Sequence, residues 1–95
     1  MARRQPARVA GVSRKVVMYR TDWCPYCARA LDLLHAKGVA VEEIDVDAVP
    51  GARAEMTARS GRSSVPQIFI GSEHIGGCEE LHELDAAGRL DPLLK

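Results

Sequence analysis

The sequence contains few aromatic residues, few cysteines and no long apolar run. Trp, Tyr and Phe make up 4% of its 95 residues, and there are three cysteines. An odd number of cysteines argues against a fully paired disulfide framework of the secreted kind, so we expect a reducing, cytoplasmic setting in which the cysteines react. No apolar run approaches the roughly 20 residues needed to span a bilayer, which argues against a membrane protein.

The formal net charge is zero, but the charges are unevenly distributed. Residues 1–15 carry five Lys or Arg and no acid, and residues 1–14 lack apolar periodicity. We interpret residues 1–14 as a basic, disordered tail. Its four arginines have no interleaved aromatics, so we expect no nucleic-acid binding. Residues 15–95 contain no internal repeat or linker and are long enough for one domain with its own core.

The most informative stretch is Cys24-Pro25-Tyr26-Cys27, which follows the apolar residues 16–19 and precedes a segment of helical spacing. Two cysteines at this spacing, between a strand and a helix, are typical of a redox-active pair. At the start of a helix, free backbone N–H groups and the helix dipole favour a thiolate at Cys24. Pro25 fits the first helical position because its missing N–H would have no partner there. Cys27 would then form and break a disulfide with Cys24.

The remaining pattern predicts an α/β fold. We expect strands over residues 15–20, 39–46, 67–70 and 73–75, and helices over 28–37, 52–60 and 78–87, followed by a last apolar turn. Residues 39–46 place apolar side chains at both parities, so we expect burial on two sides, a bulge or an early end. The first helix should bury Ala28, Leu31, Leu34 and His35, and the second should pack through Ala54, Met56 and Ala58.

Three patterns occur together in this order: the cysteine motif, Val65-Pro66 before the third strand, and Gly76-Gly77-Cys78-Glu79-Glu80 at the third helix. With them, residues 15–95 resemble a dithiol glutaredoxin of the bacterial type. The resemblance implies a thioredoxin fold, which is a four-stranded mixed sheet flanked by helices on both faces. It also implies a monomeric enzyme that reduces protein–glutathione mixed disulfides and protein disulfides, with glutathione as co-substrate and no metal.

The resemblance also assigns roles to residues. Cys24 would be the nucleophile and Cys27 the resolving thiol. Val65-Pro66 would form a cis-proline turn whose backbone pairs with the substrate. The glutathione-binding residues would be Arg20, Tyr26, Arg53, Ser64, Val65, Gly77, Cys78, Glu79 and Glu80. In this scheme Cys78 and Glu79 offer backbone N–H groups, Glu80 pairs with the ligand's ammonium group, and the two arginines hold its glycine carboxylate.

Other functions remain open from sequence. Cys24, Cys27, Cys78 and His82 have the types and spacings of a Cys₃His zinc set. An iron–sulfur carrier is a related binding role. A third alternative is a thioredoxin-like reductase served by a flavoprotein, because Trp23 precedes the first cysteine. The third cysteine, Cys78, would be an inert helix-start residue or a regulatory thiol.

Overall fold

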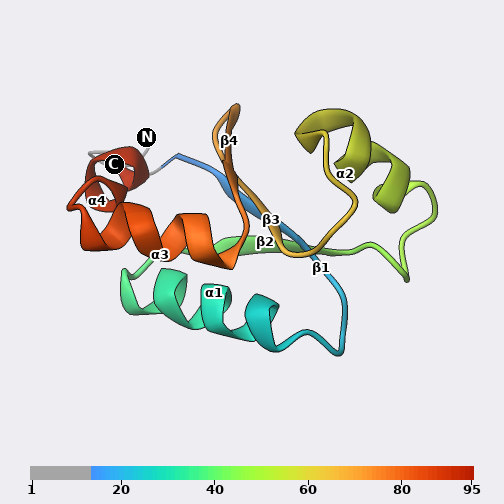
Figure 1. Ribbon diagram of the computed structural model, residues 1–95, viewed down its shortest axis with the longest axis horizontal. Coiled ribbons are helices and arrows are strands. Elements are labelled where there is room, and N and C mark those ends of the chain that lie inside the picture. The colour runs from blue at the N-terminus through green and yellow to red at the C-terminus, as the bar shows by residue number, and fades with distance from the viewer. Residues whose placement is uncertain (1–13) are drawn as a thin grey trace, which may run out of the picture.

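A four-stranded mixed sheet forms the centre of the molecule (Figure 1). The computed structural model describes residues 14–95, so the predicted tail lies outside the described residues except for Arg14. The strand order is β2-β1-β3-β4. The strands are β1 (Val16–Arg20), β2 (Val41–Asp45), β3 (Gln67–Ile70) and β4 (Glu73–Gly76). β1 pairs in parallel with β2 and antiparallel with β3, and β3 pairs antiparallel with β4.

Helices cover both faces of the sheet, which confirms the predicted fold class (Figure 1). The helices are α1 (Pro25–Ala36), α2 (Ala52–Ser60), α3 (Cys78–Ala86) and α4 (Leu90–Leu94). α1, α3 and α4 pack on one face, and α2 packs on the other. Within residues 14–95, none of the helices has the length and apolar character needed to cross a bilayer.

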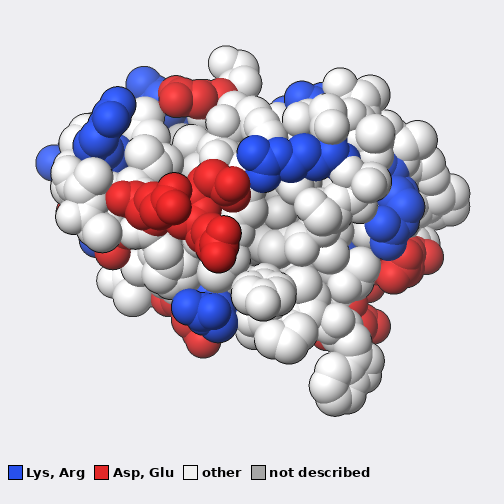
Figure 2. All heavy atoms as spheres, viewed as in Figure 1, with Lys and Arg blue, Asp and Glu red and all other residues white. Residues whose placement is uncertain are grey.

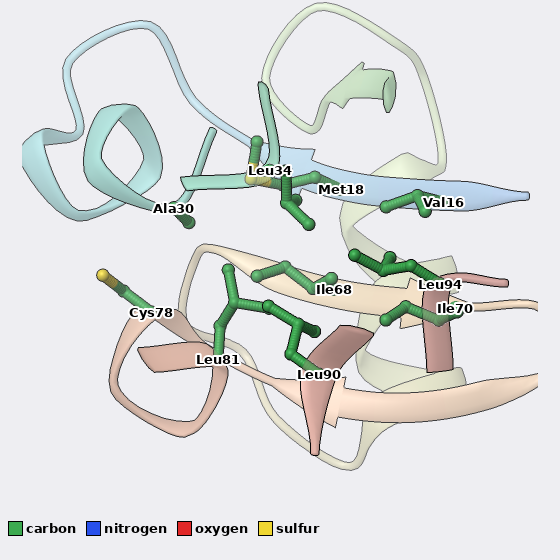
Figure 3. Packing of buried hydrophobic residues seen from close by; sticks show 10 residues of the cluster. All are labelled: Val16, Met18, Ala30, Leu34, Ile68, Ile70, Cys78, Leu81, Leu90 and Leu94. Atoms are coloured by element: carbon green, nitrogen blue, oxygen red, sulfur yellow. The ribbon is translucent and has the colours of Figure 1, made fainter. Parts of the chain in front are cut away.

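The core has two halves because successive side chains of a strand point to opposite faces. Val16 and Met18 of β1 face α1, α3 and α4, whereas Val17 and Tyr19 face α2. Figure 3 shows the first half, in which side chains of the two central strands meet those of the helices. These opposed contacts hold β1 and β3 rigidly, and both strands lead directly to or from the candidate site.

The second strand contacts the core on both faces, as its sequence predicted, although its own side chains are only half-buried or exposed. Val39 and Val41 pack against the cluster beneath α1 and α3, whereas Ile44 packs against the cluster beneath α2. The strand proper begins only at Val41, two residues later than expected. It lies at one edge of the sheet, and its Glu42 and Glu43, on opposite faces, are exposed.

The buried helix faces differ from the predicted ones. α1 buries Cys27, Ala30 and Leu34, whereas Ala28 and His35 are exposed and Leu31 is half-buried. The buried face of α1 is rotated relative to the predicted one, because it begins at Cys27 rather than at Ala28. α2 buries Ala52 and Met56, and its Ala54 and Ala58 are exposed. Alanine fits either environment, so its spacing alone was a poor guide to the buried face.

A polar contact also fixes α2 on the sheet. The hydroxyl of the fully buried Tyr19 donates to the Glu55 carboxylate (2.7 Å) and accepts from Arg59 Nη1 (2.8 Å). Burial, followed by the hydrogen bond to Glu55, raises the pKa of Tyr19. The guanidinium of Arg59 also lies 4.1 Å from the centre of the Phe69 ring. Both ends of the helix are therefore held in fixed positions relative to the strands β1 and β3.

Candidate active site

Cys24 and Cys27 form a disulfide at the start of α1, with their Cα atoms 5.1 Å apart. Cys24 is the N-cap residue, in an extended conformation, and its Sγ accepts a hydrogen bond from the Cys27 backbone N–H (3.1 Å). Cys27 is only 4% exposed, whereas Cys24 is half-buried. The outer sulfur is thus the one that a substrate can reach, and it already receives the N–H that would stabilise a thiolate.

A sharp turn at Val65–Pro66 lies beside this disulfide. The Val65–Pro66 peptide bond is cis, and the Val65 carbonyl oxygen lies 4.0 Å from Cys24 Sγ. Pro66 is buried, while Val65 remains half-buried at the surface. Since the turn leads straight into the central strand β3, the backbone of Val65 is held next to the outer sulfur.

A cavity of about 340 Å³ extends from this turn to the start of α3. Seven of the sequence-predicted ligand-binding residues line it: Tyr26, Ser64, Val65, Gly77, Cys78, Glu79 and Glu80. The first N–H groups of α3, those of Cys78 and Glu79, have no acceptor within the helix, as at any helix start. Such groups, together with the helix dipole, suit a carboxylate.

The glycine pair allows the chain to approach closely at this corner. Gly76 has φ +116°, and a Cβ there would lie 2.9 Å from Glu80 Oε1. Gly77 has an ordinary extended backbone, but its Cβ would lie 3.3 Å from the Pro66 carbonyl oxygen. The second glycine therefore keeps a side chain out of the space between the cis-proline turn and α3.

The Glu80 side chain caps the N-terminus of α3. Its Oε1 accepts the Gly77 backbone N–H (2.7 Å), and its Oε2 lies 3.4 Å from Arg62 Nη1. The hydrogen bond from Gly77, with a smaller contribution from Arg62, lowers the pKa of Glu80 below its ordinary value of 4.5. Figure 2 shows carboxylates gathered over α3, beside a band of Lys and Arg that lies toward α2.

We expect Glu80→Ala to lower the free energy of unfolding at pH 7 by about 0.5–1.5 kcal/mol, because the Gly77 N–H loses its acceptor. A carboxyl with a lowered pKa stabilises the fold above its unfolded pKa, and this stabilisation is lost as pH falls through the folded pKa. The deficit of the variant should therefore shrink from pH 7 to pH 3. Urea unfolding at both pH values measures it, with the exposed Glu83→Ala as control. A deficit unchanged at pH 3 would contradict this role.

The structure does not bring the two predicted arginines into the cavity. Arg20 is bound by three carboxylates: Glu43 (2.7 Å), Asp22 (3.4 Å) and Asp45 (3.5 Å). The hydrogen bond to Glu43 is the main reason that the pKa of Arg20 is raised. Arg53 Nη2 pairs with Asp47 (2.9 Å), and its Nη1 lies 3.4 Å from the Ser63 carbonyl oxygen. Both guanidinium groups already have acidic partners outside the cavity.

Two lining residues were missed from sequence. Arg62 follows α2 in the chain, shortly before the cis-proline turn. It is the one Lys or Arg among the residues that line the cavity. Gln67 is almost fully buried; its amide nitrogen donates to the Ser64 carbonyl (3.0 Å), and its amide oxygen lies 2.7 Å from His74 Nε2. Their nearness to Val65-Pro66 in sequence was the available signal.

Cys78 lies at the edge of the core, with its sulfur pointing away from the other labelled side chains (Figure 3). His82 Nδ1 lies 2.9 Å from the Cys78 carbonyl oxygen and 3.5 Å from its Sγ. Among residues 14–95, no group of three or more His, Cys, Asp or Glu side chains is arranged to hold a metal ion. The four residues of the zinc hypothesis are therefore not gathered into one site.

Comparisons with known proteins agree with this geometry. The family model described as Glutaredoxin matches residues 16–75. The chain is 54% identical over 79 residues to a glutaredoxin of Pseudomonas aeruginosa, covering 83% of this chain and 94% of the relative. It is 55% identical over 80 residues to Glutaredoxin 3 of Escherichia coli K12, covering 84% of this chain and 96% of the relative.

Solved structures show the same likeness. The buckwheat glutaredoxin–glutathione complex superposes with a TM-score of 0.79 at 31% identity, covering 85% of this chain and 76% of that chain. The solution structure of glutaredoxin from Brucella melitensis gives a TM-score of 0.77 at 54% identity, covering 87% of this chain and 90% of that chain.

Proposed function

The chain belongs to the glutaredoxin family of thiol–disulfide oxidoreductases, and we propose that it draws its electrons from glutathione. One observation carries this proposal: the reachable sulfur, Cys24 Sγ, lies beside a cis-proline turn that also lines the cavity at the start of α3. A cysteine-containing peptide could pair with the Val65 backbone while its carboxylate meets the α3 N-terminus. The buckwheat relative, solved as a complex with glutathione, supports this assignment.

The reaction begins with the reduced dithiol. The Cys24 thiolate attacks the glutathione sulfur of a protein–glutathione mixed disulfide, and the protein leaves as a thiolate with the electron pair of the broken S–S bond. A second glutathione thiolate then attacks the glutathione sulfur bound to Cys24. This releases glutathione disulfide and regenerates the Cys24 thiolate. The N–H of Cys27 and the start of α1 stabilise this thiolate in each resting state.

The lining of the cavity supports an assignment of the parts of glutathione to residues. The γ-glutamyl carboxylate would meet the N–H groups of Cys78 and Glu79, and its ammonium group would meet Glu80. Arg62, rather than Arg20 or Arg53, is the cation positioned to attract the other carboxylate. Tyr26 and Ser64 complete the walls of the cavity.

Turnover with two reductants tests the proposal. We expect the protein to reduce a glutathionylated peptide when supplied with glutathione and glutathione reductase, and to turn over poorly with thioredoxin reductase. Efficient turnover with thioredoxin reductase alone would instead favour the thioredoxin-like alternative. Cytoplasmic location remains a prediction.

Replacing the resolving thiol should separate two activities. We expect Cys27→Ser to keep most of its activity on a glutathionylated peptide, because only Cys24 attacks that substrate. It should lose most of its activity on a protein disulfide, because no second thiol then releases the mixed disulfide. Initial rates on both substrates, with wild type as reference, measure the split. Equal loss on both substrates would contradict this division of roles.

A further inference from the structure

Near Cys24, outside the residues that line the cavity, the surface has two unusual features. The first is Trp23, the residue directly before the outer cysteine, which is 94% exposed. Tyr19 and Phe69, by contrast, are buried, and Tyr26 lines the glutathione cavity. A fully exposed Trp beside a reactive sulfur is the type of residue that provides most of the binding energy in protein interfaces.

The second feature is the acidic cluster formed by Arg20, Asp22, Glu43 and Asp45. One guanidinium contacts three carboxylates, so the cluster keeps a net charge of −2. Two backbone N–H groups, led by that of Asp47, hold the pKa of Asp45 below its usual range and so keep it ionised. Asp22 has 80% of its side chain exposed and is the chain neighbour of Trp23. The excess negative charge therefore reaches solvent at the residue that directly precedes Trp23 in the chain.

The cluster also borders the redox pair. A hollow of about 130 Å³ is lined by Arg20, Asp22 and Glu43 together with Cys27 and the first turns of α1. Figure 2 shows carboxylates at this end of the molecule, at the lower right near the connection from β1 to α1. The glutathione cavity, by contrast, is lined by residues of the cis-proline turn and α3. The hollow and the glutathione cavity thus share no lining residue.

From this arrangement we propose that Trp23 and the acidic cluster form a docking surface for protein substrates that carry Lys or Arg beside the glutathionylated cysteine. The inference rests on the proposed function, since it places the protein half of the mixed disulfide outside the cavity that holds the glutathione half. A Lys or Arg can pair with the surplus carboxylate charge and stack on the indole ring, which is the strongest aromatic partner for a cation. Glutathione, with its two carboxylates, is unsuited to this surface.

The substrate's basic residue has a second effect on the exchange. In the first step, the bond between glutathione and the substrate cysteine breaks, and the substrate sulfur leaves with the electron pair while Cys24 joins glutathione. A neighbouring Lys or Arg lowers the pKa of that leaving thiol, and a leaving thiol of lower pKa departs faster. The docking surface would thus select those substrates whose thiolates leave readily.

Three glutathionylated peptides of equal length test the proposal, with Lys, Ala or Glu on both sides of the cysteine. The Lys peptide has a better leaving thiol on any enzyme. We therefore compare variants by one ratio, kcat/KM for the Lys peptide divided by kcat/KM for the Glu peptide. We expect wild type to show a ratio of about 30 or more at low salt, falling as salt rises. Asp22→Lys should lower that ratio about ten-fold, and Trp23→Ala about five-fold, with Trp23→Phe in between.

A matched control is Glu73→Lys, which makes the same change in charge at an exposed carboxylate. Glu73 pairs with Ile70, which pairs with Val16, so it lies at the opposite end of the sheet from Arg20. This variant should keep the wild-type ratio. If Asp22→Lys and Trp23→Ala kept the wild-type ratio, the proposed docking surface would be wrong. This holds even if all three proteins show full glutathione-dependent turnover. Absence of turnover on the Ala peptide with glutathione would instead refute the proposed function.

Discussion

Cys24→Ser is expected to abolish turnover on both glutathionylated peptides and protein disulfides, with a loss of about 10³-fold or more. The reaction requires a thiolate at this position, and a serine hydroxyl stays protonated at neutral pH and does not form the intermediate disulfide. The fold should survive, because Cys24 is a half-buried N-cap residue and serine is a favourable N-cap residue. Initial rates and thermal unfolding of the same preparation measure both expectations.

Cys27→Ser serves as the matched variant for this experiment, since it removes the partner sulfur while leaving the nucleophile in place. The two serine variants should differ by orders of magnitude on the glutathionylated peptide. If Cys24→Ser retained activity close to that of Cys27→Ser, the assignment of the outer sulfur as nucleophile would be wrong.

Gly77→Val should raise KM for a glutathionylated peptide by about ten-fold or more. A Cβ at Gly77 would already lie 3.3 Å from the Pro66 carbonyl oxygen and 3.3 Å from Glu80 Oε1. The two further methyl groups of valine extend from this crowded Cβ at the corner where the γ-glutamyl end is proposed to bind. The backbone of Gly77 has negative φ, so valine causes no backbone strain there. The cost to folding comes from steric crowding, of about 1–3 kcal/mol, and from the loss of a favourable N-cap residue.

The decisive measurement compares substrates. We expect the KM for a non-glutathione disulfide of similar size to change less than that for the glutathionylated peptide, and Gly77→Ala to give a smaller effect in the same direction. If Gly77→Val slowed both substrates alike, the corner would not be a glutathione site and the thioredoxin-like alternative would gain support.

The fold was largely predictable because its signals are local. Apolar runs marked the strands, and glycines such as Gly61 and Gly71 marked where elements end. The contacts of the second strand with both halves of the core also followed from the parity of Val41 and Ile44. Which alanines face inward was not predictable, since a methyl group gains little from burial and its spacing carries little information.

Site residues were predictable from sequence where the course of the backbone sets their positions. They were not predictable where the position of a side chain depends on which charged group it pairs with. Gly77 and Val65 line the cavity because their positions follow from the turn and the helix start. Arg20 pairs instead with Glu43 and Asp45, and that choice depends on the parallel register that sets Arg20 opposite Asp45. Such a register is a property of the assembled sheet. Arg62 was missed for the same reason, because its partner Glu80 lies 18 residues away in sequence.

The position of β2 has a consequence for association between copies of the protein. Within residues 14–95, β2 is an edge strand, so one row of its backbone N–H and C=O groups has no neighbouring strand. Such a row can recruit the edge of a second molecule and extend the sheet. Three of its five residues, Glu42, Glu43 and Asp45, are acidic. Lys15 pairs with Glu42, and Arg20 pairs with Glu43 and Asp45, so two cations offset only part of the charge of these three acids. A second β2 approaching in register would bring like charges together, so mutual repulsion disfavours sheet extension across this edge.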